Sequence, residues 1–551
     1  MTRTGEVRDG AATAVAGVDF GSDSVRALVI DPRDGTELAL AFAEYPRWRD
    51  QQYCRPGEQL FRQHPLDHLE ALERCFAAVA EQLGPQAVGA LAIDATASTV
   101  APVDRAGRPL ALLAAHKDDP DAMFWLWKDH TATAEAAAVN EALVGADPDH
   151  TRYQGEYSSE WWWAKILRGV VVAPWLRREA WSWMEHSDWV TALLTGAQRP
   201  EQTIRNSCSA GHKALYNRRL GGPVPRAALA RVDPYLGAVG ETLLWPPRPA
   251  GSFAGRLTPE WASRLQLSPG TVVGVGSIDA HAGAVGAGIA AGTLVKVMGT
   301  STVDLFLADY AQLKDADLRS LCGFAEDSIV PGLLGGESGQ AAFGDLFAWF
   351  ARLVMSFGAD GDGSSRQTVG SVLARLEEEA AQRSDDGIVG LDWLNGRRYP
   401  EPNDRARAAF VGLGIGHDAA DLYRAVVIAA VMGSKAIFEG LTAAGLGLER
   451  MVLVGGVARK SRFVCQLMAD ALGLDAMVAR DSEVCAKGAA IYAAVAAGVH
   501  ASVPTAQAAL CPSFEVDYRP SAEGRTSMGR AFRRYQAAAS VFEGPWDGDR
   551  Q

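Results

Sequence analysis

A turn close to the N-terminus combines residue types that suit phosphate chemistry. Asp19 ends an apolar run, the turn 21–24 follows with one glycine and two serines, and Arg26 stands seven residues after the aspartate. Successive backbone N–H groups and hydroxyls in a tight turn can cradle phosphate. A carboxylate beside them can hold Mg²⁺, and a guanidinium can bind phosphate through two parallel hydrogen bonds. The pattern predicts a nucleotide-phosphate site, and the alternative is a plain turn in which Asp19 bonds its own backbone.

Asp279 is the second residue with a chemical interpretation. It follows a β-branched run that begins at residue 271 and precedes a Gly- and Ala-rich stretch, so it is expected between a strand and a helix N-terminus. The helix dipole lowers the cost of a negative charge there. Phosphoryl transfer to an alcohol uses such a carboxylate to accept the hydroxyl proton, a role worth about 10² to 10⁴ in rate. The alternative is a helix N-cap, and His281 is interpreted as structural.

Gly455 and Gly456 follow the strand-like run 451–454 and precede an expected helix. Two glycines at such a turn permit the close approach of a flat ligand or a phosphate, although similar turns are common in α/β proteins. The sequence holds no GxxxxGK[ST], HExxH or GxSxG pattern and no GxGxxG after a strand. His64 and His68 are interpreted as a surface pair.

The elements around the first turn recur once. Strand-like runs at 14–20 and 25–31 flank that turn, and runs at 294–297 and 305–309 flank a second turn beginning at Gly299. The second turn again places hydroxyl residues directly after its glycine. Two such units, one in each half of the chain, predict a duplicated α/β core.

Short apolar runs alternate with longer helical stretches elsewhere, which also predicts an α/β protein. The Pro-rich stretches 223–234 and 245–259 predict irregular surface segments, and 356–370 predicts a loop. Helices are expected at 66–83, 161–171, 179–194 and 422–441.

The composition is that of a globular protein with large cores. The 551 residues are 48% hydrophobic and 22% charged, and the formal charge is −13. An acidic chain without a basic block argues against nucleic-acid and anionic-membrane partners. No apolar run reaches the roughly 18 residues of a membrane span, and residues 1–10 do not resemble a signal peptide. Seven scattered cysteines without a CxxC pair predict reduced thiols, so a cytoplasmic protein is expected.

Taken together, these motifs resemble those of the FGGY family of carbohydrate kinases. The likeness is carried by the Asp-x-Gly-[Ser/Thr]-x-[Ser/Thr]-x-Arg pattern from Asp19 and by the strings DAHAG (279–283), MGTST (298–302) and GGVAR (455–459). Longer strings extend it over nearly the whole chain: GVDFGSDSVRALVID (17–31), DAMFWLWKDHTA (121–132), YSSEWWWAKIL (157–167), CSAGHKALY (208–216) and AAIYAAVAAGVHA (489–501). The resemblance implies two actin/hexokinase-like (ribonuclease H-like) α/β domains, a sugar-binding one over 1–285 and a nucleotide-binding one over 286–551. It also implies an active-site cleft between them.

The resemblance implies an activity as well. Within the family, the strings are most similar to those of kinases that phosphorylate L-ribulose, which implies ATP- and Mg²⁺-dependent transfer to its C5 hydroxyl in L-arabinose degradation. Asp279 is then the catalytic base, and Asp19 is the metal-site residue. The implied sugar contacts are Thr96, Ala97, Trp127, Lys213 and Glu337. The implied ATP contacts are Gly21, Ser22, Ser24, Arg26, Gly299, Thr300, Ser301, Gly455, Gly456 and Arg459.

Other functions stay open on the sequence alone. Another kinase of the family, acting on D-ribulose, ribitol or xylulose, would differ by a few hydroxyl contacts. An actin-like ATPase would share the phosphate loops but would have no need of Asp279 with the strings SAGHK (209–213) and GGESGQ (335–340). A sugar-responsive regulator would need a DNA-binding element, and no basic helix-turn-helix pattern precedes Ala14. The expected partners are a small sugar and ATP, and a homodimer is the commonest default.

Overall fold

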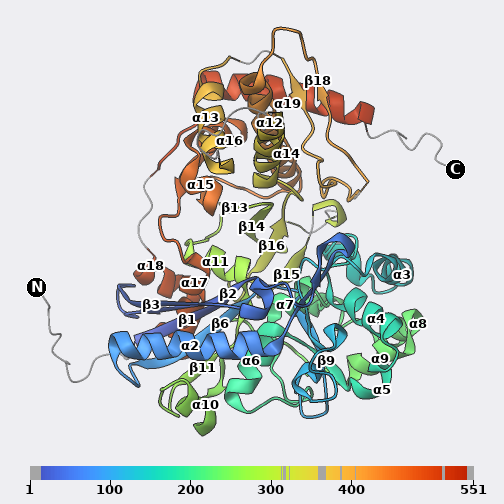
Figure 1. The fold of residues 1–551 in the computed structure, drawn as a ribbon, viewed down its shortest axis with the longest axis vertical. Helices are drawn as coiled ribbons and strands as arrows, with labels where there is room; N and C mark the ends of the chain where they lie inside the picture. The colour runs from blue at the N-terminus through green and yellow to red at the C-terminus, as the bar shows by residue number, and fades with distance from the viewer. Residues whose placement is uncertain are drawn as a thin grey trace, which may run out of the picture. The chain divides into compact units, whose positions relative to one another are not determined.

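The computed structural model describes residues 14–311, 313, 318–321, 323–357, 368–384, 387–403, 405–511 and 516–542, and they form two compact units (Figure 1). Unit 1 takes in the stretches Met1–Gly288, Phe324–Gly335 and Glu483–Pro512. Unit 2 takes in Ile289–Gly323, Gly336–Ser482 and Ser513–Gln551. These units differ from a linear division after residue 285, because two later segments pack with the first unit.

Unit 1 contains two sheets with helices on their faces. Its strands are β1 (Ala14–Phe20), β2 (Ser24–Ile30), β3 (Glu37–Glu44), β4 (Cys54–Arg55), β5 (Leu60–Gln63), β6 (Val88–Ala95), β7 (Val100–Val103), β8 (Phe124–Trp125), β9 (Ser182–Glu185), β10 (Phe253–Arg256), β11 (Val272–Gly274), β12 (Ser277–Ile278) and β15 (Phe324–Glu326). Its helices are α1 (Pro46–Arg49), α2 (Pro65–Leu83), α3 (Thr133–Leu143), α4 (Trp162–Val172), α5 (Leu176–Glu179), α6 (His186–Thr195), α7 (Ser207–His212), α8 (Arg226–Val232), α9 (Pro234–Glu241), α10 (Pro259–Arg264), α11 (Asp279–Gly286), α17 (Val484–Ala496) and α18 (Val503–Leu510).

Unit 2 contains one main sheet and a smaller strand pair. Its strands are β13 (Thr293–Met298), β14 (Thr302–Ala308), most of β16 (Leu334–Ser338), β17 (Val389–Gly390), β18 (Phe410–Val411), β19 (Arg450–Val454) and β20 (Asp475–Val478). Its helices are α12 (Gly344–Phe357), α13 (Val369–Ala381), α14 (Ala419–Ala443), α15 (Gly456–Lys460), α16 (Arg462–Leu472) and α19 (Ala522–Phe542).

The main sheets of the two units share one order over five strands, which confirms the predicted duplication; β10 extends the first sheet beyond β11, and β15 extends the second beyond β16. In unit 1 the order is β3–β2–β1–β6–β11, with β1 antiparallel to β2 and parallel to β6. In unit 2 the order is β16–β14–β13–β19–β20, with β13 antiparallel to β14 and parallel to β19. Each sheet therefore begins with a hairpin, and the hairpin turns begin at Gly21 and Gly299.

The two faces of β1 meet different helices. Its even-numbered side chains lie in an apolar cluster that also contains residues of α2. On the other face, a Cβ added at Gly17 would lie 1.7 Å from the carbonyl oxygen of Ala486 in α17. Because successive side chains of a strand point to opposite faces, Asp19 shares the α17 face with Gly17.

A second apolar cluster of unit 1 is rich in tryptophan. It joins β8 and β9 to the helices α3, α4, α8 and α9. Its largest side chains are all fully buried: Trp125, Trp162, Trp163 and Trp183. Trp127 lies outside this cluster and is partly exposed, so core packing does not account for it.

The prediction of a single helix over 179–194 is wrong in its first part. Residues 182–185 form β9, which pairs antiparallel with β7, and α6 begins only at His186. All four β9 side chains are buried, so the apolar pattern there has no helical period. The irregular segments predicted at 223–234 and 245–259 also contain regular elements, α8 and β10.

The prediction of His64 and His68 as a surface pair is also wrong, because both are buried. His64 is the N-cap of α2, where its Nδ1 accepts the N–H of Leu66 at 3.1 Å. His68 lies within α2 against the His186 ring, with the two ring centroids 3.9 Å apart. Spacing along the chain did not reveal these partners, since His186 lies more than a hundred residues away.

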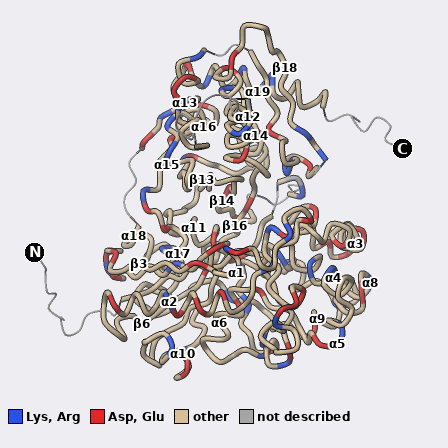
Figure 2. The backbone as a smooth tube through the Cα atoms, in the orientation of Figure 1, with Lys and Arg blue, Asp and Glu red and all other residues tan. Residues whose placement is uncertain are grey.

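The helix predicted at 422–441 is confirmed as α14, which starts with a capping box formed by Asp418 and Asp421. This helix is long and apolar enough to cross a membrane, but 67% of its apolar window is buried inside the protein, as in a core helix. Acidic and basic residues are interspersed over both units (Figure 2). The loop predicted at 356–370 lies largely outside the described residues.

Candidate active site

Three carboxylates come together at the carboxyl ends of neighbouring strands in unit 1. Asp19 and Asp94 are register partners on the parallel strands β1 and β6. Ser277 of β12 pairs with Asp94, which brings Asp279, two residues later, to the same edge of the sheet. Asp19 and Asp94 are buried, and Asp279 is partly exposed. This strand edge is the usual place for a ligand in an α/β sheet.

Burial raises the pKa values of all three groups, and the charge of Asp19 adds to the rise at Asp94 and at Asp279. Burial raises the pKa of Asp279 to about 7, and the charge of Asp19 adds to the effect. Burial and the charge of Asp19 hold the pKa of Asp94 well above its usual range, and burial also raises the pKa of Asp19. The site therefore favours either protons or a cation.

The donor set fits Mg²⁺. The two Asp94 oxygens are buried, and among the described residues no N–H or O–H donor reaches them. The Asp19 carboxyl lies next to the Asp94 carboxyl. The two can form a hydrogen bond only when one of them is protonated. Carboxylate oxygens are the ligands that Mg²⁺ prefers, and a cation in place of the proton would satisfy both groups.

The turn after Asp19 presents only part of the predicted phosphate site. The Gly21 N–H donates to the Ser24 carbonyl at 3.0 Å, which closes the turn. Ser24 is fully buried and its hydroxyl donates to the Asp23 carboxylate at 2.7 Å, so this hydroxyl points away from solvent. Ser22 remains partly exposed.

Arg26 lies between two carboxylates on the same face of the sheet. Its Nη1 is 3.3 Å from Asp19 Oδ2, and its Nε is 3.3 Å from Glu483 Oε2. Glu483 is the N-cap residue of α17. These two ion pairs orient the guanidinium beside the first turn.

Close packing of two helices fixes Asp279. It is the first residue of α11, and its Oδ1 accepts the N–H of Ala280 at 2.6 Å. A Cβ added at Gly286 of α11 would lie 2.0 Å from the Val484 carbonyl oxygen of α17. The small residues after Asp279 therefore serve helix contact, because the α11 and α17 backbones touch where a side chain has no room.

Lys213 provides positive charge beside Asp279. It is the C-cap residue of α7 and is 8% exposed, and its charge opposes the rise in the Asp279 pKa. Its carbonyl accepts the hydroxyl of Tyr157 at 2.6 Å. A buried ammonium next to a carboxylate can donate to a substrate hydroxyl that the carboxylate also contacts.

The predicted sugar residues Thr96 and Trp127 both reach the strand end that carries Asp19. The Thr96 N–H donates to the carbonyl of Phe20 at 3.2 Å, and the Thr96 hydroxyl lies 2.8 Å from that of Thr99. The indole N–H of Trp127 donates to Ser22 Oγ at 2.9 Å. The segments that carry Thr96 and Trp127 thus contact the end of β1 and the turn that follows it. Ala97 follows Thr96 and is partly exposed.

Unit 2 brings its own predicted nucleotide residues together. The Gly299 N–H donates to the Ser301 carbonyl at 3.0 Å, so this turn is closed by a carbonyl two residues on, whereas the turn of unit 1 is closed by a carbonyl three residues on. A Cβ on Gly455, whose φ is +102°, would lie 2.7 Å from the Met298 carbonyl oxygen. The turn at 299–301 and the turn at 455–456 are therefore neighbours. Only glycine fits this contact, since the left-handed φ and the close backbone both exclude a side chain.

Two further predicted residues lie on the surface of unit 2. Arg459 is exposed on α15, and its N–H donates to the Gly455 carbonyl at 3.3 Å. Glu337 is partly exposed on β16, and its N–H donates to the Gly323 carbonyl at 2.8 Å. That Glu337 meets the sugar residues of unit 1 stays a prediction.

Two residues of the site were missed by the sequence analysis. Asp94 stands near the end of β6 as Asp19 stands near the end of β1, and the apolar run 88–93 before Asp94 contained the signal, because parallel strands align their carboxyl ends. Gly344 begins α12, and a Cβ there would lie 2.5 Å from the Gly299 carbonyl oxygen. No local pattern distinguishes that glycine, since the contact joins positions 45 residues apart.

Comparisons with known proteins give the family of this chain and its fold. Residues 294–497 match the C-terminal domain of the FGGY family of carbohydrate kinases. The chain is 38% identical over 544 residues to a ribulokinase of Vibrio parahaemolyticus, covering 96% of each chain. It is 36% identical to a ribulokinase of Halalkalibacterium halodurans, covering 88% of this chain and 86% of the relative. The solved xylulose kinase of Rhodospirillum rubrum has the same fold, with a TM-score of 0.77 at 19% identity over 96% of this chain and 99% of that one.

The chain belongs to the FGGY family of carbohydrate kinases. It is a phosphotransferase, with a sugar and ATP as the substrates that this membership implies. The two-domain actin/hexokinase-like α/β fold expected from its motifs agrees with the solved structures of sugar kinases that it matches.

Proposed function

We propose that this kinase phosphorylates L-ribulose at its C5 hydroxyl with Mg-ATP, giving L-ribulose 5-phosphate and ADP. The closest support for the sugar is the similarity to ribulokinases over almost the full chain. The observation that carries the chemistry is the placement of Asp279, at the N-terminus of α11 and beside the Asp19–Asp94 pair. The reaction belongs to L-arabinose breakdown in the cytoplasm.

Asp279 acts as the general base. The C5 oxygen attacks the γ-phosphorus, its proton passes to the Asp279 carboxylate, and the bond between the γ-phosphorus and the bridging oxygen breaks to release ADP. A pKa of about 7 suits this role, because the group is ionised in a useful fraction at neutral pH and still accepts a proton readily.

The remaining residues bind and orient the substrates. Thr96, Ala97, Trp127, Lys213 and Glu337 contact the sugar: the Trp127 ring stacks on C–H groups, while Lys213 and Glu337 bond hydroxyls. The first phosphate turn contributes Gly21, Ser22 and Arg26, and Ser24 supports it from its buried position. The second unit contributes the ATP residues Gly299, Thr300, Ser301, Gly455, Gly456 and Arg459.

Asp19 would hold the metal, with Asp94 beside it. Mg²⁺ when bound neutralises charge on the phosphate oxygens of ATP. The fit rests on the two adjoining carboxyls described above, whose pKa values burial raises, because a bound cation would stabilise their ionised forms.

The organisation of the chain follows the family. The part over 1–285 binds the sugar and carries the base, the part over 286–551 binds the nucleotide, and the cleft between them holds the reaction. We expect neither a nucleic-acid nor a membrane partner from the acidic composition, and a homodimer as the default assembly.

The test is a coupled ADP-release assay with Mg-ATP across L-ribulose, D-ribulose, D-xylulose, ribitol, glycerol and no sugar. The proposal expects the highest kcat/KM with L-ribulose and little ADP without a sugar. A clear preference for another polyol would replace the proposed substrate and leave the base in place. Equal ADP release without any sugar would instead identify an actin-like ATPase.

A further inference from the structure

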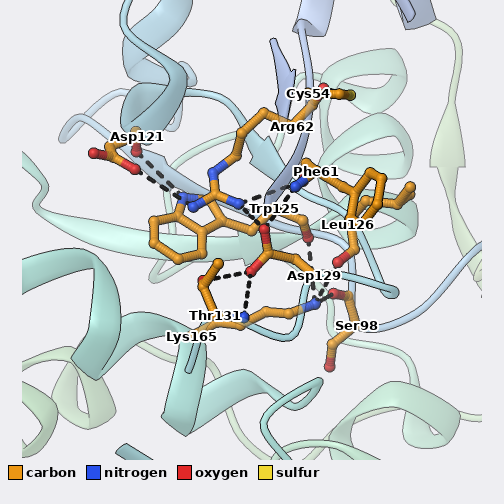
Figure 3. A network of polar contacts seen from close by, with 10 residues as sticks. All are labelled: Cys54, Phe61, Arg62, Ser98, Asp121, Trp125, Leu126, Asp129, Thr131 and Lys165. Atoms are coloured by element: carbon orange, nitrogen blue, oxygen red, sulfur yellow. Dashed lines mark hydrogen bonds and ion pairs between the residues drawn. The ribbon is translucent and has the colours of Figure 1, made fainter. Parts of the chain in front are cut away.

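The ammonium group of Lys165, a residue of α4, contacts two backbone segments at once. The side chain is completely buried. Its Nζ donates to the Ser98 carbonyl at 2.6 Å and to the Leu126 carbonyl at 2.7 Å, and the Trp125 carbonyl lies at 3.5 Å (Figure 3). A lysine ammonium has three donors and no acceptor, so converging carbonyls are the partners it needs.

The two segments are those that carry sugar residues in unit 1. Ser98 follows Thr96 and Ala97 in the loop between β6 and β7, and Leu126 directly precedes Trp127. The same loop is held from the other side by Glu185, whose Oε1 accepts the Thr99 N–H at 2.9 Å. The strand pairing of Val100 with Trp125 joins the two segments on one side, and the lysine adds a second direct link between Ser98 and Leu126.

Charged neighbours compensate the buried ammonium. Asp129, Glu160 and Glu185 raise the pKa of Lys165, while Arg62 and the larger effect of burial lower it, to about 8. Asp129 also accepts the N–H of Phe61 at 2.8 Å and pairs with the Arg62 guanidinium.

The Arg62 guanidinium, in turn, holds the strand before Trp127 from the opposite side. It lies 3.4 Å from the centroid of the Trp125 ring (Figure 3). The backbone that leads into Trp127 is thus fixed between two buried cations, Arg62 and Lys165. Loss of the Arg62 contact or of the Lys165 contact would therefore change the direction in which the Trp127 side chain points.

We propose that Lys165 is a positioning residue for the sugar site, which sets the loop 96–99 and the segment 125–127 in the relation that sugar binding needs. The inference rests on the proposed function, because it takes Thr96, Ala97 and Trp127 as sugar contacts. Lys165 itself touches neither sugar nor nucleotide. Replacing Lys165 would displace the residues that contact the sugar, and the KM for the sugar should therefore rise. A misplacement of about 1 Å in such a group can cost about 10²-fold in rate.

The test compares Lys165→Met, Lys165→Gln and the control Lys435→Met. Lys435 is also largely buried and donates to a backbone carbonyl, that of Ala471 at 2.9 Å, in unit 2. The KM for L-ribulose, the KM for Mg-ATP and the melting temperature are measured for each. We expect the sugar KM to rise at least about tenfold in Lys165→Met and less in Lys165→Gln, whose amide still donates two hydrogen bonds. The ATP KM stays within about twofold, and Lys435→Met leaves both KM values unchanged.

Each other outcome is decisive. Unchanged sugar KM in a folded Lys165→Met enzyme, or an equal rise in both KM values, overturns the positioning role. Failure of both Lys165 variants to fold while Lys435→Met folds also overturns it, in favour of a purely structural lysine. If the wild type prefers another polyol, the proposed substrate is wrong, and the Lys165 variants are then compared with that polyol. The positioning role is thus tested independently of the identity of the sugar. Sugar-independent ADP release by the wild type overturns both proposals.

Discussion

Replacing Asp279 by asparagine should remove the proposed general base and little else. The amide has nearly the same shape and its oxygen can still accept the Ala280 N–H, which Asp279 Oδ1 now accepts at 2.6 Å. General-base assistance is worth about 10² to 10⁴ in rate, so kcat for L-ribulose phosphorylation should fall by at least about 10²-fold. Sugar KM should change much less than kcat.

The pH dependence gives the same prediction a second, independent measure. The pKa of Asp279 is about 7, so the carboxylate fraction is about one tenth at pH 6 and about nine tenths at pH 8. Only the carboxylate accepts the proton, so wild-type kcat/KM should rise about tenfold per unit below pH 7 and level off above it. In Asp279→Asn this limb should disappear.

A stability measurement separates loss of the base from loss of the fold. The folded-state pKa of Asp279 is raised above its unfolded value of 3.8, so ionisation destabilises the folded state as pH rises through about 7. At pH 8 the neutral asparagine should therefore be at least as stable as the wild type. The control is Asp118→Asn, at an exposed aspartate whose side chain is 75% accessible, which should leave kcat and its pH profile unchanged.

The assay is steady-state ADP release from pH 5.5 to 8.5, with coupling enzymes in excess at every pH and thermal unfolding of each variant at pH 8. If kcat/KM of Asp279→Asn still rose with pH up to about 7, the general base would be another residue. Wild-type kcat/KM that stays flat down to pH 5.5 would refute the raised pKa. A loss of activity accompanied by a fall in melting temperature would show that the residue acts through the fold.

Further predictions concern packing, charge and acid stability. Gly286→Ala should cost about 1–3 kcal/mol of unfolding free energy, because its Cβ would lie 2.0 Å from a carbonyl oxygen, whereas Gly416→Ala meets nothing within 4 Å and should cost little. Lys296→Met should cost about 3–5 kcal/mol in chemical denaturation, since it leaves Asp304, now 2.7 Å away, buried and unpaired, and adding Asp304→Leu should recover most of the loss. The pKa of His186 falls to about 3 by burial, so stability is lost as pH drops below about 6.5, at up to about 1.4 kcal/mol per unit, and His186→Phe should remove this share of the acid sensitivity. Equal slopes of unfolding free energy against pH in the wild type and in His186→Phe would contradict this role of His186.

The hairpin at the start of each main sheet could be predicted from the sequence. The runs on either side of Gly21 and Gly299 are apolar, rich in β-branched residues and separated by a glycine with hydroxyls, and these are local signals. The duplication was predicted from the same pattern, whereas the order of the other strands was seen only in the structure. Asp19 and Asp279 were found in the same way, since each stands at the end of an apolar run.

The residues that sequence reasoning missed depend on contacts between distant positions. Asp94 became part of the site through register pairing with Asp19 across 75 residues. His68 is buried because the His186 ring packs on it, and β9 is a strand because β7 is there to pair with it. Burial of this kind is decided by the tertiary partner, so propensity and spacing do not reveal it.

Backbone contact explains why the carboxylates of unit 1 are held so firmly with few hydrogen bonds of their own. Asp19 ends β1, which meets α17 at Gly17, and Asp279 begins α11, which meets α17 at Gly286. Both carboxylates are therefore fixed to the same helix through contacts that leave no room for a Cβ. A side chain added at either glycine would move one carboxylate relative to the other. It should therefore reduce kcat by more than its effect on stability would suggest, because the proposed proton transfer and metal binding need both groups at once.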